Sequence, residues 1–159
     1  MSGVANVLMG IIGATVTMGV ASVGTSSLSP RYEDAQTTAR AVMALSAVKQ
    51  TNAAVIMART VDGGVESGLA GVQKMVADGW LSRIPDNPTS FDPSAAPMVA
   101  PAADGSRYIQ MRLVGDNGSL CDEIARQVGM EAAPIAEVAP RTGAGCVRTS
   151  SGSVAYSRD

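Results

Sequence analysis

The chain has 159 residues, a net charge of −2 and no histidine. This length suffices for one modest domain with a single hydrophobic core. The lack of histidine removes the commonest general base and metal ligand, and the net negative charge gives no nucleic-acid footprint. Because only 3% of the residues are aromatic, the core must be built from Val, Ile, Leu, Met and Ala. We therefore expect no enzymatic activity, no cofactor, no metal site and no specific nucleic-acid binding.

The first 29 residues contain no Lys, Arg, Asp, Glu or His, and the first charge is Arg31. Val4 to Val23 is an apolar stretch of about the 20 residues that a helix needs to cross a bilayer. A secretory signal peptide needs a basic start, which is missing here. The segment is therefore either a bitopic span or the mature end left after removal of a short basic leader. Small residues, which let helix backbones approach closely, recur through it, including Gly10, Gly13, Gly19 and Gly24.

Residues 30–61 are predicted to form an amphipathic helix. Ser29 is a fair N-cap, and Pro30 is tolerated in a first helical turn. Apolar residues recur at steps of three or four and mark the face expected on the core: Ala35, Ala39, Val42, Leu45, Val48 and Val55. If this helix continues residues 1–29, it spans about 90 Å, with a bend at Pro30.

Residues 62–106 read as a long connection between this helix and the later strands. A short helix is expected over 65–78, with Val65, Leu69, Val72 and Val76 on one face, and a short strand at Met98–Val99. Pro85 and Pro88 exclude regular structure between them. Asp86 and Asp92 invite a calcium-loop reading, but their spacing fits no EF-hand, and we interpret them as solvated turn carboxylates.

Residues 107–159 carry the predicted sheet. Arg107–Leu113 alternates, with Ile109, Met111 and Leu113 on one face. A short helix follows, for which Ser119 and Asp122 fit a capping box. Residues 142–145 are expected to be flexible, and Cys146–Val147 and Ser153–Ser157 to be the last strands. The fold class is therefore α+β, a long N-terminal helix laid on an antiparallel sheet.

The two cysteines are Cys121 and Cys146. An apolar N-terminal segment favours a periplasmic or extracellular context, where disulfides persist. A bridge would close a loop of 25 positions, worth about 3–4 kcal/mol in the chain-entropy model. The alternative is two unrelated buried thiols, and the compartment favours the bridge.

These features resemble type IV pilins, and within them the type IVb group typified by the bundle-forming and toxin-coregulated pilins. The resemblance rests on Ala14–Val20 (A-T-V-T-x-G-V), on the Gly79-Trp80-Leu81 loop and on the cysteine-bounded C-terminal region. It implies a pilin fold in which residues 1–29 are the transmembrane and polymerisation segment and residues 30–159 the globular head. It also makes Met1 the mature N-terminus, which the family methylates on its amine.

One position departs from the family pattern. The family places Glu at mature position five, where its carboxylate pairs with a neighbour's N-terminal amine, but this chain has Ala5. We expect Asn6, or a freed backbone carbonyl, to accept a hydrogen bond from the Met1 amine instead. Replacing Asn6 with Leu should then impair assembly.

The resemblance implies the major subunit of a type IV pilus, a helical homopolymer built on packed N-terminal helices. Its partners would be other copies, the inner membrane before assembly, the prepilin peptidase and the pilus assembly machinery. The final location would be an extracellular fimbrium, with residues 62–106 and 119–157 making lateral contacts and any adhesion. Two alternatives stay open: a minor pilin or secretion pseudopilin of the same fold, which Ala5 favours, and a bitopic periplasmic protein.

Overall fold

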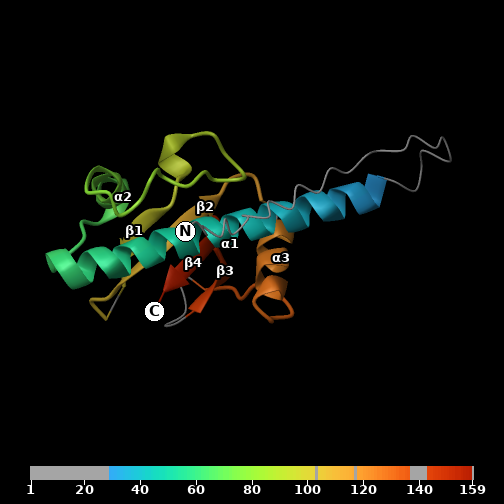
Figure 1. Cartoon of the computed structure of the whole chain (residues 1–159). Coiled ribbons are helices and arrows are strands. Elements are labelled where there is room, and N and C mark those ends of the chain that lie inside the picture. The colour runs from blue at the N-terminus through green and yellow to red at the C-terminus, as the bar shows by residue number, and fades with distance from the viewer. Residues whose placement is uncertain (1–28, 103, 117, 137–142, 159) are drawn as a thin grey trace, which may run out of the picture.

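The computed structural model describes residues 29–102, 104–116, 118–136 and 143–158. It has the predicted α+β class, with one long N-terminal helix lying across a four-stranded antiparallel sheet (Figure 1). The predicted membrane segment lies outside the described residues, apart from Ser29. The helices are α1 (Ser29–Asp62), α2 (Gly68–Ala77), the short 3-10 helix η1 (Pro93–Ala95) and α3 (Ser119–Gln127), and the strands are β1 (Met98–Pro101), β2 (Arg107–Leu113), β3 (Gly143–Thr149) and β4 (Gly152–Arg158).

The sheet has the order β1-β2-β4-β3, so the last strand of the chain lies inside the sheet. β4 pairs with β2 on one side, through registers such as Met111 with Ala155, and with β3 on the other. The predicted alternation of β2 is confirmed, because Ile109, Met111 and Leu113 belong to the main core beneath α1. Tyr108 belongs to a smaller cluster of buried residues. Central placement of β4 fixes the C-terminal strand by hydrogen bonds on both edges.

The face that α1 turns to the core agrees with the predicted one only in part. Val48 and Val55 are buried and Leu45 is half-buried against the core, as predicted. Ala35 and Ala39 are exposed, and Val42 is 51% exposed. The first fully buried residue of the helix is Ala41. The buried α1 residues are mostly small: Ala41, Ala44, Ala47, Val48, Thr51, Asn52, Ala54, Val55 and Ala58. Small side chains allow a helix to lie close to the sheet, so the buried face is shifted toward the alanines and leaves Val42 out while still including Val48 and Val55.

The buried polar residue Thr51 is compatible with this face. Its hydroxyl donates to the carbonyl of Ala47 at 2.8 Å, so no polar group of the side chain is left unpaired. Thr51 can therefore lie on the buried face of α1 as a small side chain whose polar group is satisfied.

The connection between α1 and β2 is ordered along its described length. α2 is the predicted short helix, with Val65 and Val72 buried and Leu69 and Val76 half-buried. β1 is longer than the predicted Met98–Val99. Gly71 of α2 lies close to the residues just before the helix. A Cβ on Gly71 would lie 1.9 Å from the carbonyl oxygen of Glu66.

Two C-terminal predictions are wrong. Ser119 does not cap α3. Instead, the carboxylate of Asp116 accepts hydrogen bonds from the backbone N–H groups of Leu120 and Cys121, which lie in the first turn. An acid outside the helix can serve as a cap because the first N–H groups lack helical partners. Gly143–Gly145 is part of β3, since pairing with β4 orders a sequence that is locally weak.

Within the described residues one helix, Arg31–Asp62, is long and apolar enough to cross a membrane. More than half of its apolar stretch is buried against the head. A helix that packs on the core of a domain has the same length and composition, so these two properties do not distinguish a core helix from a membrane span.

Candidate functional site

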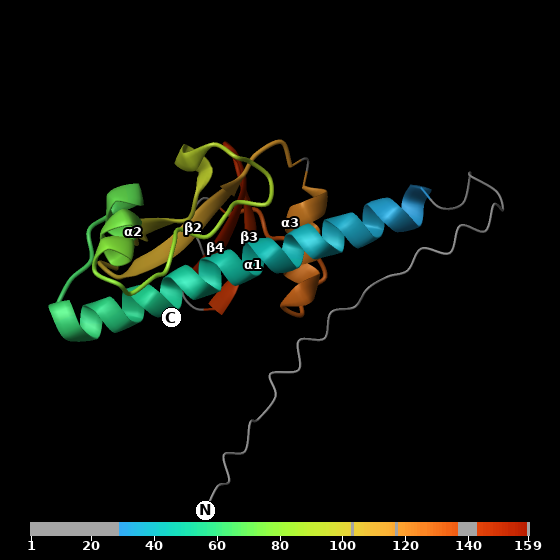
Figure 2. The same ribbon diagram turned by 45° about the horizontal axis from the view of Figure 1, so that its top comes forward.

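The start of α1 projects away from the head. Figures 1 and 2 show its first turns, in blue, running past α3. Residues 31–40 are exposed except for the half-buried Thr37. A hydrogen bond of 3.2 Å from the Thr38 hydroxyl to a carboxylate oxygen of Glu123 on α3 ties this stretch to the head. α1 therefore leads the chain toward the uncharged residues 1–28 at a point beyond the head.

The outward face of α1 carries large apolar side chains. We call them the outer row: Val42, Met43, Ile56, Met57 and Val61, which are 38–68% exposed. Core helices normally bury their largest apolar residues. Here the helix buries five alanines with Val48 and Val55, and leaves the larger apolar side chains of the outer row in water. Exposed apolar residues gathered on one face are typical of an interaction surface.

Asn87 organises the loop that lies beside α1. Its side-chain amide donates to the carbonyls of Ala95 and Arg112, at 2.6 and 2.7 Å. Its side-chain oxygen accepts from the backbone N–H and the hydroxyl of Thr89, at 2.9 and 2.7 Å. Thr89 also accepts from the N–H of Val114. One buried side chain thus joins the loop to η1 and to the end of β2.

This ordered loop presents Phe91, the only phenylalanine of the chain, to solvent. Phe91 is 107% exposed. The residues on both sides of it are fixed, because the N–H of Asp92 donates to the Ser90 hydroxyl at 3.0 Å and the N–H of Ser94 donates to Asp92 at 2.9 Å. Phe91 is therefore an aromatic side chain held out on a constrained backbone.

Two grooves lie along α1 next to this loop. The larger, of about 1020 Å³, lies between α1, the loop and the β2–α3 turn, and Arg40, Phe91 and Asp116 are among its lining residues. The smaller, of about 370 Å³, we call the α1 groove. Its lining is Val42, Met43, Ser46, Ala47 and Gln50 from α1 with Ser82, Arg83, Pro85 and Asp86 from the loop.

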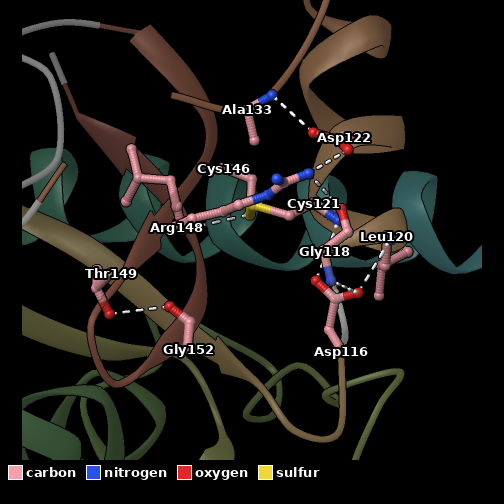
Figure 3. The surroundings of a disulfide bond; sticks show 11 residues. Asp116, Gly118, Leu120, Cys121, Asp122, Ala133, Cys146, Arg148, Thr149 and Gly152 are labelled. Atoms are coloured by element: carbon pink, nitrogen blue, oxygen red, sulfur yellow. Dashed lines mark hydrogen bonds and ion pairs between the residues drawn. A yellow bond between two sulfur atoms is a disulfide. The ribbon is translucent and has the colours of Figure 1, made fainter. Parts of the chain in front are cut away.

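The predicted disulfide is present and holds the far end of the head together. Cys121 of α3 and Cys146 of β3 are bonded and fully buried (Figure 3). Beside them the guanidinium of Arg148 forms an ion pair with Asp122 and donates to the carbonyl of Gly118. Asp122 also accepts from the N–H of Ala133 at 2.9 Å. The covalent and polar links together fix α3 on the sheet.

Of the two acids considered for calcium, Asp92 has a structural role and Asp86 is largely solvated. Asp92 caps η1, and hydrogen bonds from Ser94 lower the pKa of its carboxyl. Asp86 lies 3.7 Å from Arg83, with both side chains largely exposed. Among the described residues no group of three or more His, Cys, Asp or Glu side chains is placed to hold a metal ion.

Most residues of the predicted assembly segment lie outside the residues that the structure describes. Met1, Ala5, Asn6, Gly10, Gly13, Gly19 and Gly24 lie outside them, and Pro30 lies in the first turn of α1. Phe91 and Asn87 were missed. The only sequence signal for Asn87 was its place between two prolines, and for Phe91 its being a single phenylalanine in a polar loop. Comparisons with protein-family models, with curated proteins and with solved structures found no match.

Proposed function

We propose that this protein is the structural subunit of a type IV pilus filament. The observation that carries the proposal is the projection of α1 beyond the head, toward 28 residues that hold no charge. Such a segment needs apolar surroundings, and it has two, the bilayer before assembly and a bundle of identical segments afterwards. Transfer between two apolar environments costs little, and Gly and Ala let helices pack closely.

The exposed outer row supports association between copies of the chain rather than a monomer in the membrane. Repeated heterologous contacts that do not close into a ring generate a helical filament. In such a filament the N-terminal segments form the centre, and the heads, each with a pilin fold tied by the disulfide, form the surface. The subunit waits in the inner membrane and ends in an extracellular fimbrium.

A second candidate is a minor pilin or secretion pseudopilin, and Ala5 favours it. A subunit that needs no neighbour above it has no use for a carboxylate at that position. Electron microscopy of sheared surface material, with mass spectrometry, separates the two. A dominant band at about 16 kDa from filaments supports the major subunit, and a trace amount among other pilins supports the minor one.

A pair of variants tests the packing of the N-terminal segments. Gly13→Leu should abolish filaments while leaving the chain in the membrane, because the longer side chain separates the helices. Gly13→Ala keeps a small residue and should retain filaments. Normal filaments from Gly13→Leu would refute close packing at that position.

A further inference from the structure

The last strand of the chain lies inside the sheet and not at its edge. β4 pairs with β2 from Ser153 to Ser157, and with β3 along its whole length. In the described sheet β2 and β3 are not neighbours, so β4 is the strand that joins them. Chain ends usually tolerate truncation because few contacts hold them. Here, by contrast, the two halves of the sheet depend on the last residues of the chain.

The side chains of β4 complete both clusters of buried residues. Ala155 is fully buried in the main core, whereas Tyr156, which is 2% exposed, belongs to the smaller cluster. Neighbouring residues of a strand point to opposite faces, so one strand serves both clusters. Without β4 the other side of the sheet is the pair β1 and β2, and an isolated two-stranded pair is marginally stable in water.

The end of β4 is fastened to the first hairpin of the sheet. The side chain of Arg158 is only 6% exposed, and its guanidinium forms an ion pair with Asp104. It also donates to the hydroxyl of Ser106 at 2.7 Å. Both partners lie in the turn between β1 and β2. A buried charge needs such partners, so this link forms together with the entry of β4 into the sheet.

β3 has links to the rest of the head that do not involve β4. The disulfide joins Cys146 of β3 to Cys121 of α3. On the outer edge of β3 the N–H of Arg148 donates to the carbonyl of Pro134 at 2.9 Å, and its carbonyl accepts from the N–H of Ala136 at 3.0 Å. Because neighbouring strands lie roughly 4.7–4.9 Å apart, these links hold β3 about 10 Å from β2, one strand-width beyond direct pairing.

We propose that β4 is a latch, which closes the head only after the last residues of the chain have been made. Domains generally fold as units while the chain is synthesised from its N-terminus, but residues 29–151 lack the strand that joins β2 to β3. The head therefore stays open until residues 152–158 enter between them. An incomplete chain then has no closed head. This inference does not depend on the proposed function, but in a filament it would keep incomplete subunits out.

Translation arrest of the full chain tests the order of events. The chain is followed by a flexible Gly/Ser tail and an arrest sequence, and the arrested complexes are treated with a protease in detergent. A tail longer than the ribosomal exit tunnel leaves β4 outside, and the head should resist cleavage. A tail shorter by the length of β4 holds this strand in the tunnel, and the head should be cleaved.

A matched control separates the absence of β4 from crowding by the ribosome. A flexible Gly/Ser insert between Ser150 and Ser151 moves the preceding residues away from the tunnel while β4 stays inside it, and long inserts at a turn cost little. With the short tail this chain should still be cleaved, and with the long tail it should resist. Resistance of the inserted chain while β4 is in the tunnel would overturn the latch.

A variant of the released full chain gives a second measurement. Ala155→Pro should be cleaved about a hundredfold faster than wild type, because proline breaks the ladder of a central strand and the protease cleaves the open form. A synthetic peptide of residues 150–159 should enter the open sheet of this variant and slow its cleavage, whereas the same peptide with Ala155→Pro should not. Wild-type resistance of the variant, or equal effects of the two peptides, would overturn the proposal.

Discussion

Asn87→Ala should destabilise the head strongly although the residue lies in a loop. Asn87 is only 7% exposed and makes four hydrogen bonds, two as donor and two as acceptor. At roughly 0.5–1.5 kcal/mol of net stabilisation each, four bonds are worth roughly 2–6 kcal/mol. In the variant the N–H and hydroxyl of the half-buried Thr89 can form hydrogen bonds with water instead. We therefore expect a loss in the lower half of this range, about 3 kcal/mol in the free energy of unfolding.

Asn87→Asp separates hydrogen bonding from packing, since it changes the volume little. The carboxylate can still accept from Thr89, but it turns an oxygen toward the carbonyls of Ala95 and Arg112. At pH 7 it should therefore destabilise at least as much as Asn87→Ala. Acidification protonates the carboxyl and lets it donate to one carbonyl, so the deficit relative to wild type should shrink toward pH 4.

The assay is urea unfolding of the full chain in detergent micelles. Trp80, the only tryptophan, reports through its fluorescence, because it packs half-buried against the core. If Asn87→Ala and Asn87→Asp both unfold within about 0.5 kcal/mol of wild type, the loop is not held as the hydrogen bonds imply.

Three further predictions use the same assay. Replacing both Cys121 and Cys146 with Ser should lower the stability by about 3–4 kcal/mol, and an unchanged urea midpoint would contradict this. Gly71→Ala should cost about 1–3 kcal/mol because its Cβ meets a backbone carbonyl at 1.9 Å, whereas Gly64→Ala, which faces open space, should be neutral; equal effects would refute the close contact. Burial raises the pKa of Tyr156 above its ordinary value of 10.0, so the unfolded chain ionises first and stability should fall as the pH rises above 10. Tyr156→Phe should flatten this alkaline decline, and an unchanged slope would show that another group causes it.

Local patterns were sufficient to predict most elements of the fold. Alternation identified β2, helical periodicity identified α2, and the compartment argument identified the Cys121–Cys146 bridge. These features depend on neighbours in sequence or on general chemistry. They do not require knowledge of which segments meet in space.

The remaining features depend on contacts between distant segments. Asp116 replaced Ser119 as the cap of α3 because the turn before the helix placed a carboxylate at its N–H groups. Asp122 then became free to pair with Arg148, which lies 26 positions away. The buried role of Asn87 likewise depends on carbonyls 8 and 25 positions distant. No local pattern encodes such partners.

The core face of α1 was predicted only in part, and the part that was wrong is the most informative. Periodicity assigned the face with Val42 to the core because larger apolar residues usually gain more from burial. The helix buries the predicted Val48 and Val55 together with alanines, which allow close approach to the sheet, and leaves the outer row, including the predicted Val42, in water. A helix with apolar residues on both faces reads as a membrane span by composition, and α1 does so. Its inner face is satisfied by the sheet, so the outer face gains only if something else covers it. This exposed outer face is what we expect if, as we propose, copies of the chain associate with one another.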